Sequence, residues 1–494
     1  MSGQCSISTS TIVGVDALPV DVEVDVGAGL PSFAIVGLPD LAVQEARERV
    51  RSALRFSGYE IPNARIVVNL APGPLRKHGT GFDLPIALGI LGATRQLPES
   101  VTRDVVAVGE LSLDGSVRPV PGMLAHALSA RSAQRTLVGP EEENGLHVEG
   151  LDYRPLRRLS SLHNGLPEPA VERSVSAAST ERLIDFKEVV GQEIALRALL
   201  AAAAGGHNVL MVGPPGSGKT MLARRLPGIL PPLDEYERLQ TALVHSVAGI
   251  DDQAALSGVR PFRAPHHSAS VAGLVGGGSP PRPGEASLAH NGVLFLDEMV
   301  QFGPAALQSL RQPLEDGTVT LVRAEGRVNF PARFSLVGAA NPCPCGFLGD
   351  ESRICSCNVA QIDRYNARIG GPLMDRIDLV VEVRRPDPSL LLEPATGPDS
   401  QQLLERVLEA RSLAARRGLG ATSRLSGAAL LASCCLIAGA GDFLENAARA
   451  HHLSGRGITR LLRVSRTFAD LDGAARVGIE HLSEAIGFRA KDGR

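Results

Sequence analysis

A glycine-rich segment that ends in lysine and threonine carries the clearest chemistry in the chain. Its residues are Gly213, Pro214, Pro215, Gly216, Ser217, Gly218, Lys219 and Thr220. The segment follows the apolar run Asn208–Val212 and precedes the helix-like run Met221–Arg225, which is the strand, loop and helix context of a phosphate loop. In such a loop backbone N–H groups wrap the phosphates, Lys219 reaches the β- and γ-phosphates, and Thr220 holds Mg²⁺. We therefore predict a site for ATP and Mg²⁺.

Two carboxylates follow a second apolar run, Val293–Leu296. Downstream of a phosphate loop, Asp297 is predicted to complete the Mg²⁺ shell, and Glu298 to orient and activate the attacking water. A third apolar run, Phe334–Ala340, ends at Asn341, whose amide is predicted to position that water and to sense the γ-phosphate. A turn-forming asparagine in front of a proline is the plainer alternative for this position.

An arginine in the segment GPLMDRIDL (371–379) suits a role in charge stabilisation. Arg376 is predicted to reach the phosphoryl group bound by a neighbouring subunit, an arginine finger of the kind worth about 10³–10⁵ in rate. A structural ion pair with Asp375 or Asp378 is the alternative, and the sequence leaves both open.

Four of the seven cysteines stand in two close pairs: Cys343, Cys345, Cys355 and Cys357. Four thiolates can fill the tetrahedral shell of a structural Zn²⁺, although C-x-C half-sites are shorter than the common ones. Zinc there would hold the loop that leaves Asn341. The alternative is four reduced thiols in a glycine-containing loop, as a reducing compartment favours.

Length and composition restrict the class of protein. The 494 residues are enough for two to four domains. A net charge of −3 and an aromatic content of 3% without Trp argue against attraction of nucleic acid by the overall field and against a base-stacking platform. The first residues show no secretory signal, and polar residues interrupt the most apolar run, Ile194–Val212, so it is no plausible membrane span. We expect a cytoplasmic protein without membrane contact.

The elements in front of residue 160 are typical of an α/β domain with a mixed sheet. Alternating runs over Leu18–Val26 and Ala64–Leu70 predict strands, whereas Leu41–Arg55 and Pro85–Leu91 predict helices. Residues 160–182 are rich in Ser, Pro and Ala, which predicts a linker.

The part after the linker has two patterns. Short apolar runs that end in polar motifs are typical of buried parallel strands in a doubly wound sheet. From about Ser389 the pattern becomes helical, most clearly over Ser400–Arg417. We therefore expect an α/β chain with an N-terminal domain at 1–165, a linker at 166–182, a nucleotide-binding core at 183–388 and a helical lid at 389–494.

Motifs from residue 186 to residue 471 resemble one known family. They are FKEVVGQ (186–192), the phosphate loop, PFRAPHHSAS (261–270), RPGEASLAHNGVLFLDE (282–298), NPCPCGFLGD (341–350), GPLMDRIDL (371–379) and SGRGITRLLRVSRTFADL (454–471). In this order they resemble the ComM/YifB family of magnesium-chelatase-like AAA+ ATPases. The resemblance implies an AAA+ core with a helix-2 insert and a pre-sensor hairpin, a homo-hexamer, and an ATP-dependent helicase or branch-migration motor on DNA in recombination or natural transformation. It also implies that Asn341 is the first sensor, Arg376 the trans-acting finger, and either Arg456 or Arg460 the second sensor on the lid.

Two segments are candidates for the DNA contact that the resemblance implies. The insert between the phosphate loop and the acidic strand contains His266 and His267, which could touch nucleic acid or metal but are as readily structural. Residues Thr318–Phe330 alternate polar and apolar side chains around a glycine-containing turn, which predicts a β-hairpin. We predict that Arg323 and Arg327 near its tip contact backbone phosphates without reading bases. A solvated hairpin tip is the alternative.

Residues 73–124 resemble the proteolytic domain of Lon and the similar domain of the DNA-repair ATPase RadA, notably in HGTGFDLP (78–85) and GELSLDGSVRPV (109–120). The resemblance implies a fold of the ribosomal S5 domain 2 type. A Lon-type protease needs a serine activated by a lysine, and the matching positions hold Gly81 and Leu124. We therefore expect a domain without peptidase activity. The basic run Arg76–His78 is its best candidate for nucleic-acid contact, or else a solvated face.

Two rival functions stay open. A chelatase-type ATPase would remodel a metal-inserting partner protein, but the Lon-like domain is expected to be foreign to chelatase motor subunits, and the chain shows no integrin-like domain. A scaffold could bind ATP merely to oligomerise. The presence of Glu298 and Arg376 argues against that scaffold.

Overall fold

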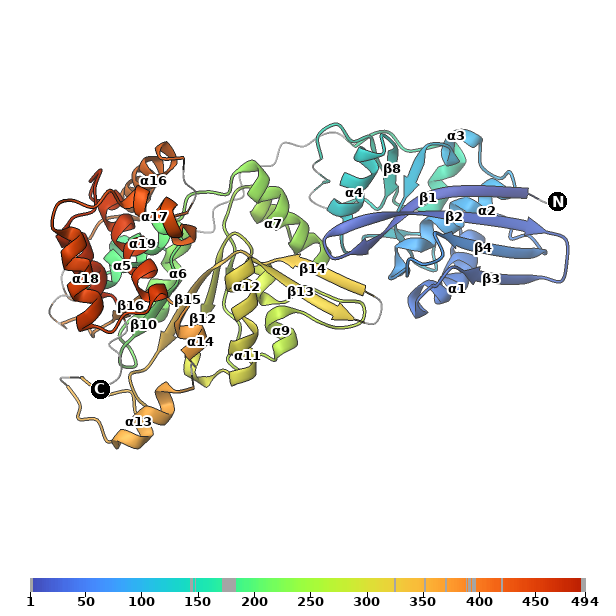
Figure 1. Cartoon of the computed structure of the whole chain (residues 1–494). Coiled ribbons are helices and arrows are strands. Elements are labelled where there is room, and N and C mark those ends of the chain that lie inside the picture. Colours follow the sequence, from blue (N-terminus) through green and yellow to red (C-terminus); the bar gives the residue numbers. More distant parts are fainter. Residues whose placement is uncertain are drawn as a thin grey trace.

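The computed structural model describes residues 3–142, 145–146, 148–170, 184–323, 326–350, 352–368, 371–387, 389, 392, 397–418 and 421–489. The N-terminal domain lies at one end of an elongated molecule, the predicted nucleotide-binding core in the middle, and the helical C-terminal domain at the other end (Figure 1). Residues 171–182, which make up most of the linker predicted at 166–182, lie outside the described residues. None of the helices described is long and apolar enough to cross a membrane.

The N-terminal domain is built on a mixed seven-stranded sheet in the order β3-β4-β2-β1-β5-β8-β9. The strands are β1 (Gly3–Val13), β2 (Asp16–Gly27), β3 (Ser32–Val36), β4 (Arg65–Ala71), β5 (Val105–Ala107), β8 (Thr136–Gly139) and β9 (Tyr153–Pro155). In β2 every second residue from Val20 to Val26 is buried, because alternate side chains of a strand point to opposite faces. The strands predicted from alternation are therefore confirmed, as is the mixed sheet.

Helices cover the buried face of this sheet. They are α1 (Leu41–Phe56), α2 (Asp83–Ala93), α3 (Glu99–Thr102) and α4 (Met123–Ser132), and a small ladder joins β6 (Glu110–Leu111) to β7 (Val117–Arg118). Helix α1 begins at Asp40, whose carboxylate accepts a hydrogen bond from the Val43 N–H at 2.9 Å, an N-cap. Helix α2 is buried on nearly all sides, because it packs against both the sheet and α1.

The core contains a parallel five-stranded sheet in the order β11-β12-β15-β10-β16. Its strands are β10 (Val209–Val212), β11 (Phe262–Arg263), β12 (Val293–Leu296), β15 (Ser335–Ala340) and β16 (Leu379–Glu382). Apolar side chains fill both faces, as is usual for parallel strands covered by helices. Since all the strands run the same way, the residues that follow β10, β12 and β15 meet at one edge.

Short helices and one hairpin complete the core. The helices are α5 (Glu193–Gly205), α6 (Lys219–Arg225), α7 (Glu235–Ala248), α8 (Gln253–Leu256), α9 (Val271–Val275), α10 (Glu285–Leu288), α11 (Pro304–Ser309), α12 (Arg311–Asp316), α13 (Val359–Asn366) and α14 (Gly371–Met374). The predicted hairpin consists of β13 (Thr318–Arg323) and β14 (Gly326–Pro331), which pair antiparallel.

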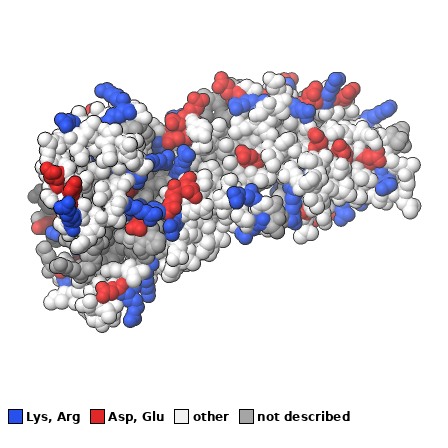
Figure 2. Space-filling view, viewed as in Figure 1, with Lys and Arg blue, Asp and Glu red and all other residues white. Residues whose placement is uncertain are grey.

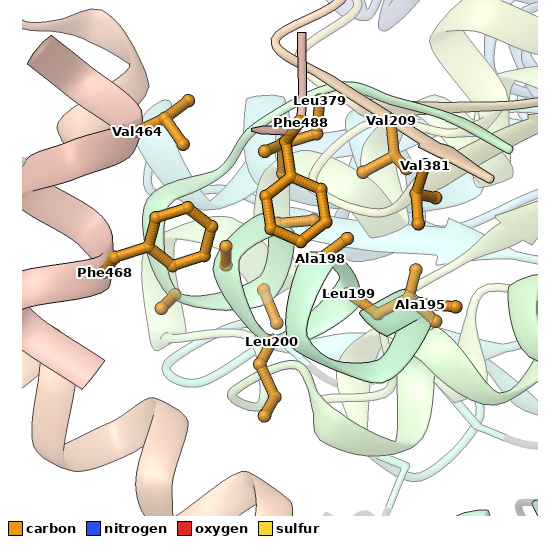
Figure 3. Packing of buried hydrophobic residues seen from close by; sticks show 14 of the residues in the cluster. Ala195, Ala198, Leu199, Leu200, Val209, Leu379, Val381, Val464, Phe468 and Phe488 are labelled. Atoms are coloured by element: carbon orange, nitrogen blue, oxygen red, sulfur yellow. The ribbon is translucent and has the colours of Figure 1, made fainter. Parts of the chain in front are cut away.

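The helical C-terminal domain packs on the core through one continuous apolar cluster. Its helices are α16 (Ser400–Arg416), α17 (Gly427–Cys434), α18 (Ala440–Ala450), α19 (Gly455–Leu471) and α20 (Ile479–Gly487). Figure 3 shows Phe468 of α19 and Phe488 turned toward Ala198 and Leu199 of α5. Truncating a buried phenylalanine such as Phe468 typically costs about 3–5 kcal/mol, so this contact contributes substantially to the attachment of the helical domain to α5.

The N-terminal domain is attached to the core through α4 and α7. An apolar cluster joins Met123 and Leu124 of α4 to Leu233 and Ala242. The backbone N–H of Gly122 donates to the carbonyl of Ser246 at 2.8 Å, and the N–H of Leu124 donates to the Ser246 hydroxyl at 3.2 Å. The two domains are therefore joined by both apolar burial and hydrogen bonds.

Candidate nucleotide site and its surroundings

The phosphate loop lies between β10 and the start of α6, as the sequence predicts. Gly216 and Gly218 have positive φ angles of 77° and 93°, a conformation that residues with a side chain rarely adopt. Gly213 lies so close to the neighbouring chain that a Cβ there would come within 2.0 Å of the Val383 carbonyl oxygen. The glycines are thus required by the shape of the loop and by its packing.

The Lys219 side chain lies over the loop that precedes it. Its Nζ donates hydrogen bonds to the carbonyl oxygens of Gly213 at 2.7 Å and Pro214 at 2.8 Å, and lies 3.4 Å from Oδ1 of Asn341. Burial lowers the pKa of Lys219, while the nearby carboxylates Asp297 and Glu298 act in the opposite direction. The ammonium group is therefore placed among the loop carbonyls, the Asn341 amide and the two acids.

The acidic strand end supplies the second part of the site. The Thr220 hydroxyl donates to Oδ2 of Asp297 at 2.8 Å, so the two oxygens predicted to hold Mg²⁺ are adjacent. Hydroxyl and carboxylate oxygens are the ligand types that Mg²⁺ prefers, so the donor set fits the ion. Glu298 has a left-handed backbone with φ of 47° and an exposed side chain. Such strain in a residue other than glycine is concentrated at functional sites.

Three further residues support the site, although no role is predicted for any of them from the sequence. The side-chain amide of Gln192 donates to the carbonyls of Ser217 at 3.3 Å and Arg384 at 2.7 Å, which ties the loop to the chain after β16. Arg385 donates to the carbonyl of Pro215 at 3.1 Å. Tyr365 hydrogen-bonds the backbone of Asn341, and burial raises its pKa. Of these, only Gln192 stands within a motif quoted above, FKEVVGQ.

The predicted finger and second sensor lie on the opposite edge of the sheet. A cavity of about 550 Å³ is lined by Asn208, Phe334 and Asp378, which directly precede β10, β15 and β16. The arginines that line it are Arg333, Arg376, Arg424, Arg456, Arg460 and Arg463. Figure 2 shows basic side chains gathered in the hollow between the helical domain and the core. Since β10 has four residues, about 13 Å of strand separates this edge from the phosphate loop of the same chain.

Arg376 is not paired with either of the neighbouring aspartates. Its guanidinium donates to Glu315 of α12. Asp378 instead accepts from the backbone N–H of Asn208 at 3.1 Å, and the Asp375 carbonyl accepts from Arg460 at 2.6 Å. Burial, followed by the nearby arginines, lowers the pKa of Arg376. The alternative prediction, an ion pair of Arg376 with Asp375 or Asp378, is therefore wrong, because the carboxylate partner is Glu315.

Comparisons with known proteins match almost the whole chain. Models of "Magnesium chelatase, subunit ChlI", "Subunit ChlI of Mg-chelatase" and "Magnesium chelatase, subunit ChlI C-terminal" match residues 185–390, 22–143 and 397–489. The uncharacterized protein YifB of Salmonella typhimurium is 42% identical over 98% of this chain and 97% of its own length. The competence protein ComM of Haemophilus influenzae is 43% identical over 97% of this chain and 96% of its own length.

The chain belongs to the ComM/YifB family of magnesium-chelatase-like AAA+ ATPases. Membership in the ComM/YifB family supports an ATPase that uses ATP and Mg²⁺. Lon protease 2 of Bacillus subtilis is 28% identical over 39% of this chain and 37% of its own length, a more distant relative. The match of residues 22–143 to a chelatase subunit model weakens the expectation that the N-terminal domain is foreign to chelatase motor subunits.

In this member of the ComM/YifB family the hairpin lies against the N-terminal domain (Figure 1). A Cβ on Gly14, in the turn between β1 and β2, would come within 2.9 Å of the Asn329 carbonyl oxygen. Arg323 and Arg327 are exposed and line a cavity of about 550 Å³ together with Arg76 and His78. The predicted candidates for DNA contact are thus brought together from two domains.

The structure also places two further candidates for nucleic-acid contact, Lys77 and the histidine pair of the insert. Lys77 is fully buried and donates to the Pro72 carbonyl, so it is neither a nucleic-acid contact nor part of a solvated face. In the insert, the rings of His266 and His267 lie 4.1 Å apart, and Nδ1 of His266 lies 2.8 Å from the Ser268 hydroxyl. The insert also contributes Pro280 and Pro281 to the cavity beside Arg323.

The four clustered cysteines follow directly after Asn341, the predicted sensor. Their sulfur atoms all lie within 4.8 Å of one another, and Sγ of Cys343 lies 3.3 Å from Cys345 and 3.6 Å from Cys355. Zn–S distances of about 2.3 Å in a tetrahedron put neighbouring sulfurs about 3.8 Å apart, so the cluster could bind a zinc-type metal. Backbone N–H groups, first that of Phe347, hydrogen-bond Cys345 and lower the pKa of its thiol to about 5.

Proposed function

We propose that this chain is an ATP-hydrolysing motor that forms a homo-hexameric ring in the cytoplasm. The ring acts on DNA as a helicase or branch-migration factor. The observation that carries the proposal is the convergence of three strand ends. They bring Lys219, the Thr220–Asp297 pair and Asn341 to one edge of the sheet, with Asn341 3.4 Å from the lysine. These are the side chains that hydrolysis of a nucleoside triphosphate requires.

In this proposal each residue has a distinct role. Backbone N–H groups of residues 213–220 and Lys219 would hold the phosphates, and Thr220 and Asp297 would supply oxygens to Mg²⁺, which would neutralise phosphate charge. Glu298, held in its left-handed conformation at the end of β12, orients and activates the attacking water. Asn341 orients that water from the neighbouring strand β15.

The proposal assigns Arg376 to the nucleotide of the adjacent subunit. It lies at the edge where the strands begin, about 13 Å of strand from the phosphate loop, which favours contact with the site of another chain over the site of its own. The same holds for Arg456 and Arg460, either of which would be the second sensor. A head-to-tail interface closed into a ring would supply all three arginines to a neighbouring site.

Two observations support action on DNA: the similarity to ComM and the basic side chains of the hairpin. ComM of Haemophilus influenzae is named a competence protein, which supports a role in natural transformation. Arg323 and Arg327, with Arg76 beside them, would contact backbone phosphates rather than bases, so binding would depend on salt and little on sequence.

We further propose that Cys343, Cys345, Cys355 and Cys357 hold one structural Zn²⁺. Four thiolates without an open position suit a structural rather than a catalytic zinc site. The N–H groups of Cys345 and Cys357 donate to Sγ of Cys357 and Cys355, each at 3.4 Å, which orients these sulfurs.

A chelatase-like ATPase that remodels a protein partner is the second candidate. The observation in its favour is that all three matching family models are described as magnesium-chelatase subunits, the N-terminal domain included. The two candidates share the nucleotide site and differ in what the motor acts on.

The deciding experiment measures ATP hydrolysis by the purified protein with and without single-stranded, duplex and four-way-junction DNA. The same junction then reports strand exchange, and Glu298→Gln serves as the hydrolysis-deficient control. We expect DNA-stimulated hydrolysis and junction migration, both absent in the variant. Hydrolysis that is indifferent to every DNA would refute the DNA motor and favour remodelling of a protein partner.

A further inference from the structure

The segment that carries the cysteines has almost no hydrophobic core of its own. Among the described residues from 344 to 366 only Gly346 is buried, and helix α13 has no buried residue. Three of its apolar side chains, Ile354, Val359 and Leu348, are 92%, 73% and 42% exposed, while Tyr365 packs partly buried against the core. Burial of apolar surface therefore cannot offset the entropy cost of ordering this stretch, and another source of stability is required.

The same segment packs directly on the phosphate loop. Gly346, which follows Cys345, has a φ of 84°, and a Cβ there would come within 2.8 Å of Pro215 Cδ and 3.9 Å of Asn341 Cγ. Pro215 is the third residue of the phosphate loop, and Asn341 is the predicted first sensor. The loop between the two cysteine pairs is thus a wall of the nucleotide site.

A single arginine fastens the two loops together. Arg385 donates to the Pro215 carbonyl at 3.1 Å and to the Ser352 hydroxyl at 3.0 Å, and forms an ion pair with Asp350 at 3.6 Å. Both Asp350 and Ser352 lie between the cysteine pairs. Their aromatic neighbour Phe347 has the guanidinium groups of Arg385 and Arg353 at 5.8 and 4.3 Å from its ring.

We propose that metal at the four-cysteine centre holds this wall in place, so that loading of the centre sets the affinity of the phosphate loop for nucleotide. The metal supplies the rigidity that apolar burial does not, and Gly346 and Arg385 transmit it to Pro215. The inference rests on the proposed ATP site and adds to it a dependence on a tetrahedral thiolate metal, zinc by ligand type.

The test compares full-length variants by metal content and by the affinity for a fluorescent ADP analogue. Wild-type protein purified without added zinc should contain about one zinc ion per chain by mass spectrometry. The double variant Cys345→Ser/Cys357→Ser should lose the metal, and its nucleotide affinity should fall about tenfold. Cys435→Ser, at an exposed cysteine outside the cluster, should change neither quantity.

Two variants that keep all cysteines guard against simple misfolding. Arg385→Ala should keep its zinc and lose about fivefold in nucleotide affinity, whereas the neighbouring Arg384→Ala, which removes only an exposed contact to Glu382, should lose nothing. Gly346→Ala should likewise keep zinc and bind nucleotide more weakly.

The possible failures are distinguishable. Wild-type protein without bound metal, or a metal-free cysteine variant with unchanged nucleotide affinity, would overturn the coupling and leave the proposed ATPase intact. Wild-type protein that carries zinc but binds no nucleotide would overturn the proposed function, and the coupling with it.

Discussion

The placement of Arg376 makes a quantitative prediction about mixed rings. Arg376→Ala removes a guanidinium that lies on the opposite edge of the sheet from Lys219 of its own chain. If it completes the site of the neighbour, the variant should bind nucleotide normally and hydrolyse it about 10³–10⁵ times more slowly. Arg311→Ala removes the other arginine that contacts Glu315, and should leave hydrolysis nearly unchanged.

Mixing two inactive variants separates action in trans from action in cis. Arg376→Ala keeps a complete phosphate loop, and Lys219→Ala keeps all the arginines at the opposite edge of the sheet. In rings assembled at random from equal amounts, about one quarter of the interfaces pair an intact Lys219 with an intact Arg376. We therefore expect hydrolysis in the mixture to recover to about one quarter of the wild-type rate per site.

The assay is steady-state phosphate release by each variant alone and by mixtures that are dissociated and reassembled together. Nucleotide affinity of Arg376→Ala provides the folding control. If hydrolysis does not recover at any mixing ratio, although differently tagged chains demonstrate mixed rings, action of Arg376 on the neighbouring site is contradicted. Full activity of Arg376→Ala alone would contradict the role itself.

Three further predictions use other parts of the chain. Glu298→Gln should bind ATP as the wild type does while phosphate release becomes undetectable, and loss of binding instead would contradict its assignment to water activation. Replacing Arg323 and Arg327 with Ala should reduce the slope of log affinity against log salt by about 1.4 on single-stranded DNA, and an unchanged slope would discard the hairpin contact. Burial lowers the pKa of His126 to about 4, so its contribution to stability is full above pH 6.5 and is lost as pH falls toward 4, by about 1.4 kcal/mol per pH unit. Urea unfolding at pH 7.5 and 5.0 should show this loss as a lower free energy of unfolding at pH 5.0. His126→Gln, which leaves a partner for the Ser10 hydroxyl, should make the difference between the two pH values smaller.

Periodicity and strand ends carry much of the fold because both are local properties. The alternation over Leu18–Val26 and the apolar run Val293–Leu296 each correspond to a strand within a residue or two of the expected bounds. The convergence of Thr220, Asp297 and Asn341 also follows, since parallel strands carry their carboxyl ends to one edge.

Contacts between distant segments do not follow from local patterns. The Arg376–Glu315 pair joins residues 61 positions apart, and Arg385 reaches Pro215 across 170 positions. An arginine beside an aspartate in the sequence favours a local ion pair, whereas the structure turns the Arg376 side chain toward α12. The burial of Lys77 between two residues that line a cavity is equally hidden from a reading of charge alone.

The strand β16 joins the two halves of the proposed mechanism. Arg376 lies just in front of it, at the edge proposed to face a neighbouring nucleotide, and Arg385 lies just after it, fastened to the phosphate loop of its own chain. Between them β16 pairs along its whole length with β10, which itself leads into that loop. If hydrolysis in the neighbouring subunit displaced the edge that carries Arg376, the displacement would therefore act on a short, half-buried strand that is hydrogen-bonded to β10. Because packed strands transmit displacement rather than absorb it, β16 would provide a direct mechanical link between successive sites of the proposed ring.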